Sequence, residues 1–225
     1  MSFPAIRSSA VSSEATDQTS HTVNLPATVE LNDLLLVFFA CDGNTAVSWP
    51  GSWVELFEKQ NTVSGTPTLS VGYLQADGTE DGTTITVTTA ASERSAHRSH
   101  AISGAELVAN QAPEAGTAES GSSANPTHPS AAATGGAKDI LWWAVYGCDD
   151  GTTTLTGTPS NYGNAENIQS DGATGCCVGS TRRELNASSE DPGNSTLSGS
   201  VPWAGNTIVI HPHSSFLLLQ EQGRV

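Results

Sequence analysis

Asp33-Leu34-Leu35-Leu36-Val37-Phe38-Phe39-Ala40-Cys41-Asp42-Gly43 is an almost unbroken apolar run. The second half of the chain contains a similar one, Asp139-Ile140-Leu141-Trp142-Trp143-Ala144-Val145-Tyr146-Gly147-Cys148-Asp149-Asp150-Gly151. Apolar residues at successive positions, instead of at every second one, predict a central β-strand that is covered on both faces. Two shorter pairs follow in the same order: Ser70-Val71-Gly72-Tyr73 resembles Cys177-Val178-Gly179-Ser180, and Glu80-Asp81-Gly82 resembles Glu190-Asp191-Pro192-Gly193. We therefore interpret the chain as two sequence repeats, a plan that is typical of a scaffold.

The composition favours strands over helices. Only 36% of the residues are hydrophobic, and Gly, Ser and Thr are abundant, which suits many short strands joined by turns. Each repeat alone has a small core for its surface, so we expect a single all-β domain. The predicted fold is an antiparallel β-sandwich, jelly-roll-like, with equivalent strands of the two repeats in facing sheets. The predicted boundaries are 1–212 for the sandwich (repeat one at about 20–104, a linker at 105–130, repeat two at about 131–212) and 213–225 for a C-terminal tail.

Within these boundaries, alternating or apolar segments predict the individual strands. In the first half we expect strands at 5–11, 22–25, 33–41, 69–75, 83–89 and 95–102. In the second half we expect them at 140–146, 173–185, 195–200 and 207–211. Segment 107–130 is expected to be mostly surface loop with one strand near 114–120, and 149–172 is expected to be a long polar loop.

The charge excludes two classes of partner. The chain has 23 acidic and 8 basic residues, a formal net charge of −15. A nucleic-acid duplex requires a basic stripe, and an anionic membrane surface repels such a chain, so we expect no nucleic acid and no membrane as partner. Two interpretations of the acidity stay open: it favours solubility alone, or it suits a protein displayed outward in many copies.

The N-terminus and the cysteines indicate the compartment. Met1-Ser2-Phe3-Pro4 lacks the basic start and apolar stretch of a signal peptide, and the longest apolar run is too short to cross a bilayer. We therefore expect synthesis in a cytoplasm. No C-x-x-C pair is present, which disfavours zinc. We expect all four cysteines to be buried and reduced: Cys41, Cys148, Cys176 and Cys177.

No set of residues predicts catalysis. Hydrolysis requires a nucleophile beside a base, but no G-x-S-x-G motif accompanies the histidines. His97 and His100 are three apart, so on a strand they point to opposite faces and cannot share a metal ion. His211 and His213 share a face, but Pro212 between them indicates a strand end. We therefore expect that the protein is not an enzyme and has no cofactor.

An acidic turn is the candidate metal site. Asp77, Glu80 and Asp81 lie close together between Ala76 and Gly82. Carboxylates on a turn can bind calcium, although the spacing does not match an EF-hand loop. Asp and Gly are also the usual residues of hairpin turns, and turn formation is the interpretation that we favour.

Loop aromatics and paired arginines are candidates for ligand binding. Aromatic side chains on a sandwich can stack against sugars, or they can close the open ends of the core, which we favour. The candidates are Trp49, Trp53, Tyr162 and Trp203. Arg182 and Arg183 alternate on a predicted strand, so one faces out and the other requires a carboxylate such as Glu184 or a loop aspartate. A structural ion pair is preferred here over an anion site.

Several segments resemble virion structural proteins of tailed bacteriophages and their prophage relatives. The resemblance extends to about Pro212, and the segment after that residue departs from the family pattern. The similar segments are Pro4-Ala5-Ile6-Arg7-Ser8, Trp49-Pro50-Gly51-Ser52-Trp53, Ala76-Asp77-Gly78-Thr79-Glu80, Arg182 to Gly193 and Trp203 to Ile210. The resemblance implies a non-catalytic β-sandwich component of the particle, located in the virion after synthesis in the host cytoplasm.

Three functions follow, in order of preference. The first is a decoration or cement protein that stabilises the phage head by non-covalent contacts with the major capsid protein or other virion proteins, either as single chains or as a homo-oligomer. Its candidate partner contacts are Phe3, Ile6, Phe216, Leu217, Leu218 and Leu219. An exposed apolar tail is unusual on a soluble monomer, so residues 216–219 either contact a partner or fold back on their own sandwich, and both interpretations stay open. The alternative is a tail-associated module that recognises host glycan. A hydrolase fragment is the least supported, since no acid, base or nucleophile can be assigned.

Overall fold

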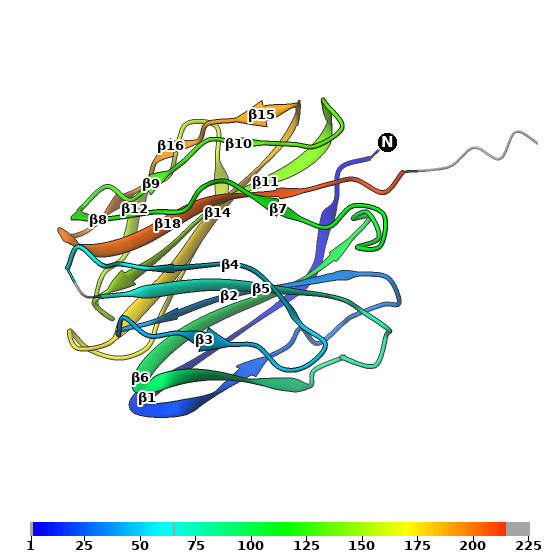
Figure 1. Cartoon of the computed structure of the whole chain (residues 1–225). Helices are drawn as coiled ribbons and strands as arrows, with labels where there is room; N and C mark the ends of the chain where they lie inside the picture. Colours follow the sequence, from blue (N-terminus) through cyan, green and yellow to red (C-terminus); the bar gives the residue numbers. More distant parts are fainter. Residues whose placement is uncertain (1, 65, 215–225) are drawn as a thin grey trace, which may run out of the picture.

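Two six-stranded antiparallel sheets face each other in the computed structural model, which describes residues 2–64 and 66–214 (Figure 1). The first sheet has the order β1-β6-β2-β5-β4, with β3 on β6. It is built from β1 (Ala5–Asn24), β2 (Leu34–Cys41), β3 (Val47–Ser48), β4 (Val54–Gln60), β5 (Thr68–Gln75) and β6 (Thr84–Ser103). The second has the order β13-β14-β11-β18-β7, with β8 on β18. It is built from β7 (Glu114–Ala115), β8 (Glu119–Ser123), β11 (Lys138–Asp149), β13 (Gly163–Gln169), β14 (Cys176–Ala187) and β18 (Val201–Ile210). The predicted all-β sandwich is confirmed.

Short two-stranded ladders lie outside these sheets. Each strand contains two or three residues, and each ladder is antiparallel. The pairs are β9 (Thr127–His128) with β16 (Gly193–Asn194), β10 (Ala131–Ala132) with β15 (Ser189–Glu190), and β12 (Leu155–Gly157) with β17 (Thr196–Leu197). In Figure 1 they lie above β11, β14 and β18, so they cover the outer face of the second sheet.

The two apolar runs form β2 and β11, which are central strands of facing sheets. The order β6-β2-β5-β4 in the first sheet corresponds to β18-β11-β14-β13 in the second. Gly72 and Gly179, matched in the two sequence segments, each lie under an aromatic ring. A Cβ at these positions would come within 2.5 Å of Trp49 and 2.3 Å of Tyr146. A duplication would produce such a correspondence, and the duplication itself remains a prediction.

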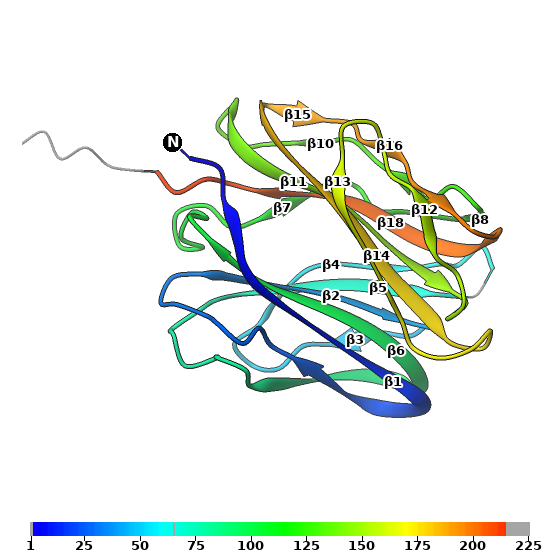
Figure 2. The ribbon, with the colours of Figure 1, turned by 180° about the vertical axis from the view of Figure 1, so that it is seen from behind.

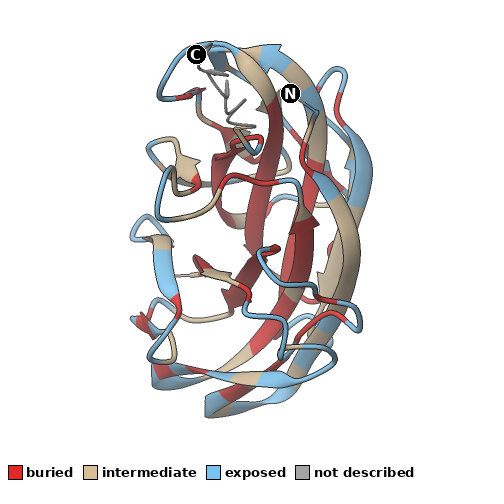
Figure 3. Ribbon diagram, turned by 90° about the vertical axis from the view of Figure 1, so that its right-hand side faces the viewer, coloured by how far each residue is buried: buried red, intermediate tan, exposed pale blue. Residues whose placement is uncertain are grey.

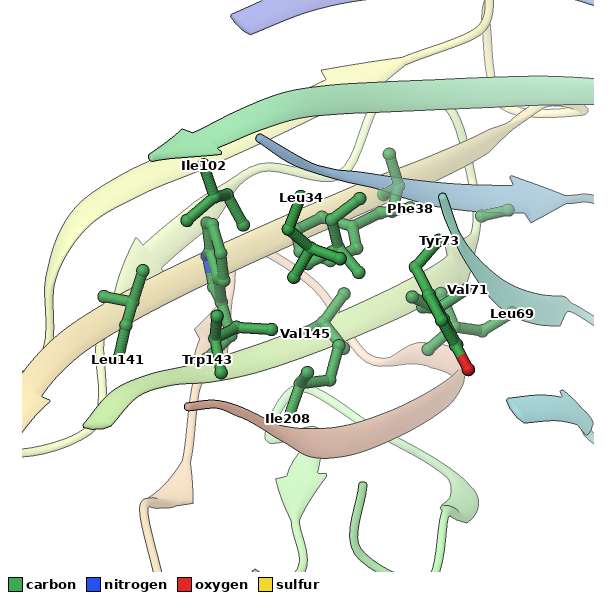
Figure 4. Close-up of a cluster of buried hydrophobic side chains, with 14 of the residues drawn as sticks. Leu34, Phe38, Leu69, Val71, Tyr73, Ile102, Leu141, Trp143, Val145 and Ile208 are labelled. Atoms are coloured by element: carbon green, nitrogen blue, oxygen red, sulfur yellow. The ribbon is translucent and has the colours of Figure 1, made fainter. Parts of the chain in front are cut away.

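Burial on both faces explains the unbroken apolar runs. Leu34, Leu36 and Phe38 of β2 point into the core between the sheets, where they meet Trp143 and Val145 of β11 (Figure 4). The alternate residues of β2 pack into a second cluster on the outer face of the first sheet. The outer face of the second sheet has two clusters of its own, one around Trp142 and one around Tyr146 and Trp203. Figure 3 shows the resulting buried central strands surrounded by exposed loops.

Strand β1 differs from the prediction. Two separate strands at 5–11 and 22–25 were expected, but a single strand runs from Ala5 to Asn24 beside β6 (Figure 2). The residues between the two expected strands are polar and show no apolar pattern that would predict a strand. Their backbone nevertheless pairs with β6, with shifts in register between Glu14 and Ser20. The Asn24 backbone N–H donates to Ser12 Oγ (3.0 Å), so the two halves of β1 bend towards each other.

Two segments expected to be mostly loop contain more strands than predicted, although β7 and the start of β8 fall where one strand was expected, near 114–120. Segment 107–130 contains β7, β8 and β9, and segment 149–172 contains β12 and β13. These strands are short or lie at sheet edges, and their Gly, Asn, Ser and Glu residues show no apolar alternation. These strands form because their backbones pair with neighbouring strands, and such pairing cannot be predicted from residue composition.

The expectation of four reduced cysteines is wrong for two of them. Cys148 and Cys177 form a disulfide, whereas Cys41 and Cys176 are buried free thiols. Cys148 on β11 lies directly opposite Cys177 on β14 in the antiparallel register. The pairing therefore depends on a register between strands 29 residues apart, which no local cysteine spacing reveals.

Candidate attachment end and surface hollows

Both ends of the described chain meet at one end of the sandwich. Ala5 pairs with Ser103 at the start of β1, and Pro212 bridges Ala105. The His213 N–H donates to the Gly104 carbonyl at 2.8 Å. Figures 1 and 2 both place the N-terminus beside the red end of β18, and Figure 3 faces this side of the molecule. We call this region, residues 3–7, 30–33, 103–107 and 211–214, the terminal end.

An arginine clamp holds the first strand at the terminal end. Arg7 of β1 donates to both carboxylate oxygens of Asp33, at 2.6 and 3.1 Å, and lies 2.9 Å from Glu30. Asp33 is 3% exposed and also accepts a hydrogen bond from the Glu30 N–H. A bidentate guanidinium–carboxylate pair is directional, so it fixes β1 against the turn that precedes β2.

A buried glutamate holds the other end of the chain. Glu106 accepts hydrogen bonds from the Leu107 N–H (3.0 Å), the Asn110 side chain (3.1 Å), and both the N–H and the hydroxyl of Ser214. Burial raises the pKa of Glu106, but the hydrogen bonds from Ser214, Asn110 and Leu107 outweigh burial and hold the pKa at about 2. The carboxylate is therefore ionised at neutral pH and anchors the chain as far as Ser214.

A hollow of about 230 Å³ opens between these two anchors. Its rim includes Leu31, a residue that is 66% exposed, and Asn32, which has a left-handed backbone (φ 71°). The lining consists of Arg7, Leu31, Asn32, Asp33, Ser103, Gly104, Ala105, Leu107 and His213. We call it the terminal hollow. It combines apolar and polar surface at the point where both chain ends converge.

The predicted partner contacts divide between the terminal end and the rest of the chain. Phe3 is half-buried and lies beside Gly104, where a Cβ in place of the glycine hydrogen would be 3.9 Å from the Phe3 carbonyl oxygen. Ile6 packs against the core between the sheets, so its side chain is partly used within the fold. Phe216, Leu217, Leu218 and Leu219 lie outside the described residues.

An ionic cluster joins the two sheets along one side. Glu166 of β13 lies 2.7 Å from Arg98 of β6, 3.3 Å from His100 of β6 and 3.5 Å from Arg182 of β14. Burial raises the pKa of Glu166, but His100, Arg98 and Arg182 together outweigh burial and hold the pKa at about 2. Burial lowers the pKa of His100, so its ring is neutral at pH 7. The sequence did not indicate this cluster, because Glu166 falls in a segment expected to be a loop.

This cluster contains the residue types of a hydrolase triad. Ser9 Oγ lies 2.8 Å from His100 Nδ1, while Glu166 approaches the opposite ring nitrogen. A nucleophile must also meet its substrate, yet Ser9 does not line the terminal hollow, nor does it line a second hollow, described below, beside β13 and β14. The carboxylate is shared with two arginines. The geometry fits a clamp between the sheets better than an acyl-transfer centre.

A second polar network lies behind the first sheet, buried except at Ser12, which is partly exposed. It runs from Ser12 to His97 (3.0 Å), from His97 to Ser95 (2.7 Å), from Ser95 to His21 (2.7 Å), and from His21 to Thr89 (2.9 Å). Burial lowers the pKa of His97 to about 3, so the ring is neutral. The network satisfies polar groups that burial would otherwise leave without partners.

The histidines do not assemble a metal centre. His97 stacks on Phe39 while His100 contacts Phe38 and Trp143, which confirms that the two rings point to opposite faces of β6. His211 and His213 pair with different carboxylates, Glu114 at 3.0 Å and Glu106 at 3.5 Å respectively. Within residues 2–64 and 66–214, no group of three or more His, Cys, Asp or Glu side chains is placed to hold a metal ion.

The acidic turn uses its carboxylates on its own backbone. Glu80 accepts hydrogen bonds from the N–H groups of Asp77 (3.1 Å), Gly78 (3.0 Å) and Thr79 (3.1 Å). Asp77 accepts from the Thr79 N–H at 3.0 Å, and Asp81 accepts from the N–H of Val29. These bonds are the interactions of a turn, which is the interpretation that the sequence favoured over calcium.

The candidate sugar-binding aromatics are largely covered. Trp53, Tyr162 and Trp203 are 8%, 6% and 6% exposed. Trp49 is half-buried, stacks on Trp53 with ring centroids 5.8 Å apart, and donates through Nε1 to Ser70 at 2.9 Å. These rings fill the clusters outside the two sheets and leave little flat surface for stacking against a ligand.

Beside β13 and β14 lies a larger, more polar hollow of about 350 Å³. Arg183 points away from the core and pairs with Glu190 at 2.8 Å, whereas Arg182 points inward to Glu166, so the two arginines alternate as predicted. The lining consists of Leu141, Asn161, Gly163, Asn164, Arg182, Arg183 and Glu184. We call it the β13–β14 hollow.

Comparisons with family models, with curated proteins and with solved structures find no match for this chain. In the described part of the chain, no helix is long and apolar enough to cross a membrane.

Proposed function

We propose that the chain is a non-enzymatic structural protein of a tailed-bacteriophage virion that decorates the outer surface of the head. The observation that carries the proposal is the convergence of both chain ends beside a hollow with an exposed leucine, Leu31. The phage assignment itself comes from the sequence resemblance. The partner would be the major capsid protein or another virion protein.

The rest of the fold suits a passive role on a particle surface. Arg7, Glu106 and Glu166 use their charges within the fold, which holds the sandwich together without a ligand. The net charge of −15 limits self-association in solution. Attachment through the terminal end would leave this acidic surface facing outward, with Phe3 and Leu31 at the contact.

The test compares two exposed apolar residues in different parts of the molecule. Leu31 is 66% exposed at the terminal end, and Val63 is 75% exposed in the loop after β4. Particles lacking the protein would be incubated with purified Leu31→Glu or Val63→Glu variants, and bound protein would be counted by immunogold labelling. We expect Leu31→Glu to lower head occupancy by about tenfold or more, because a charge is buried at the contact, and Val63→Glu to leave it unchanged.

Two results would contradict the proposal. An equal loss with both variants would remove the terminal end as the attachment site, and an absence of label on the head would remove the decoration role. Label confined to the tail would favour the second candidate, a tail-associated module that recognises host glycan. The observation in favour of that function is the polar lining of the β13–β14 hollow.

A further inference from the structure

The β13–β14 hollow arises because β14 is longer than its neighbour. Strand β13 pairs with β14 from Gln169 opposite Cys177 to Gly163 opposite Arg182, with an irregularity between Gly163 and Glu166. Strand β14 continues to Ala187. The hollow lies at this point, lined by residues on both sides of Gly163 and by Arg182 to Glu184 of β14.

The side chains of β14 divide between two faces here. Arg182 and Glu184 are two residues apart, so they point to the same face. Glu184 lies opposite Leu141, which belongs to the core between the sheets, so this face is the inner one. Arg183 points to the other face and is held by Glu190. A guanidinium and a carboxylate therefore flank the hollow from a single strand.

The polar groups around the hollow retain unused hydrogen-bonding capacity. Within the described residues, the side chains of Asn161, Asn164 and Glu184 make no hydrogen bond or ion pair with the protein. Arg182 also lines the hollow, although its buried Nη1 is directed to Glu166 at 3.5 Å. The set contains two amides that both donate and accept, one group that only donates and one that only accepts.

The two asparagines have a backbone conformation that is sterically unfavourable for most residues. Asn161 (φ 64°) and Asn164 (φ 51°) are in the left-handed region, which only three non-glycine residues of the described chain occupy. Asparagine tolerates this region better than most residues, but glycine adopts it with no steric cost. Backbone conformation alone therefore does not require an amide at either position.

We infer that the β13–β14 hollow binds a small neutral saccharide. A simple anion would be attracted by Arg182 but repelled by Glu184. A cation would be attracted by Glu184 but repelled by Arg182. A hydroxyl group both donates and accepts, so a polyhydroxylated ligand satisfies the guanidinium, the carboxylate and both amides together. A volume of about 350 Å³ lies at the lower end of the range for small-molecule sites, about 300–1,000 Å³. The inference does not depend on where the protein sits on a particle.

The experiment uses substitutions that remove the amides without straining the backbone. The full-length protein would be screened on an array of neutral and acidic saccharides, and the best neutral one titrated by calorimetry. In Asn161→Gly/Asn164→Gly we expect affinity to fall about tenfold or more, because hydrogen bonds to the ligand are lost while the left-handed backbone is kept. Glu184→Ala should also weaken binding. Arg182 is left unchanged because it belongs to the clamp between the sheets.

Asn32→Gly is the matched control. Asn32 has the same left-handed backbone (φ 71°) but lines the terminal hollow, so its replacement should leave saccharide affinity unchanged. Thermal unfolding would verify that all glycine variants fold. Binding to no saccharide, or to acidic saccharides alone, would overturn the inference. So would full affinity in the folded double-glycine variant.

Discussion

The outer faces of the two sheets are both apolar, but different structures cover them. On the first sheet the cover is the far half of the β1–β6 ribbon, with Val23 and Val87 packed against the face and the Ser12–His97–Ser95–His21–Thr89 network between the layers. On the second sheet it consists of three separate ladders whose strands have two or three residues each. Beneath those ladders the Cys148–Cys177 disulfide joins β11 to β14 of the sheet itself, in the same cluster as Leu155 and Leu197 of the β12–β17 ladder. His128 of β9 also contacts Ser195 at 2.8 Å.

From this difference we infer that the short ladders require additional contacts to hold them on their sheet, whereas the long β1–β6 ribbon does not. The ribbon is continuous with the sheet that it covers, so its backbone pairing extends directly from that sheet. Each ladder contributes few backbone hydrogen bonds and is connected to the sheet through loops. We therefore expect covalent and side-chain contacts to matter more for the second cover than for the first.

The largest effect is expected on removing the disulfide. Its loop spans 29 residues, for which the chain-entropy relation gives about 3.5 kcal/mol of stabilisation. Cys148→Ala/Cys177→Ala should lower the free energy of unfolding by about that amount, measured by urea denaturation. Hydrogen exchange should increase mainly along the β11–β14 pairing and in the β12–β17 ladder, whose Leu155 and Leu197 pack beside the disulfide.

Cys41→Ala is the matched control for that measurement. Cys41 is a buried free thiol on the outer face of the first sheet, so its replacement gives the cost of losing one buried sulfur, about 1 kcal/mol. An equal rise in hydrogen exchange under both covers would show that the disulfide acts on the whole fold and that the comparison between covers is wrong.

The cysteines also show what sequence could and could not predict. Burial of Cys41 and Cys176 follows from the apolar strands around them, and it was predicted correctly. Pairing of Cys148 with Cys177 depends on which strands are neighbours and in what register, and neither is written in local spacing. By contrast, the central strands β2 and β11 were predictable, because a strand that is buried on both faces consists of consecutive apolar residues.

The candidate site was harder to predict for the same reason. Strand β13, Gly163–Gln169, has only one large apolar residue, Ile168, so it was interpreted as loop. It nevertheless carries Glu166, the centre of the clamp, and it borders the β13–β14 hollow. Opposite orientations of His97 and His100 were predictable, because they depend only on alternation along one strand. Contacts between strands that are distant in sequence, such as those of Glu166 with Arg98 and Arg182, were not predictable.

Acidification is expected to have the next largest effect, and to act on both covers. Burial lowers the pKa of His97 to about 3 and that of His128 to about 4, from an ordinary value of 6.5. Because these values lie below that of the unfolded chain, the folded protein binds fewer protons in this window and stability falls as the pH falls. Between about pH 7 and about pH 5, each histidine should remove about 2 kcal/mol.

Carboxyl groups whose pKa is raised by burial oppose this trend: Asp42, Glu55, Glu93 and Asp149. Burial and the neighbouring Asp42 raise the pKa of Glu93 to about 7, above its ordinary value of 4.5, so its contribution to stability increases as the pH falls. Glu93 is only partly buried, and solvent screening reduces its effect. We expect a net loss of about 2–3 kcal/mol and a larger one in Glu93→Gln, measured by urea denaturation at both pH values. Constant stability over this range would contradict the assignment of neutral buried histidines.

The smallest effect is expected from replacing one buried histidine under each cover, His97 under the first and His128 under the second. His97→Leu removes the ring that contacts Ser12 and Ser95, whereas His128→Leu removes the ring that contacts Ser195. An unsatisfied buried hydroxyl costs about 1–3 kcal/mol, although Ser95 keeps its contact with His21 and Ser12 is partly exposed. At neutral pH we therefore expect both variants to lose about 1–2 kcal/mol, measured as the free energy of unfolding in urea.

The distribution of that loss distinguishes the two covers. In His97→Leu the ribbon remains paired along β6, so hydrogen exchange should increase only at residues next to the network. In His128→Leu the two-residue β9–β16 ladder loses a side-chain contact that supplements few backbone bonds, so protection should fall throughout that ladder. Wider loss of protection in His97→Leu than in His128→Leu would mean that the long ribbon depends on its polar network, and that length alone does not hold a cover in place.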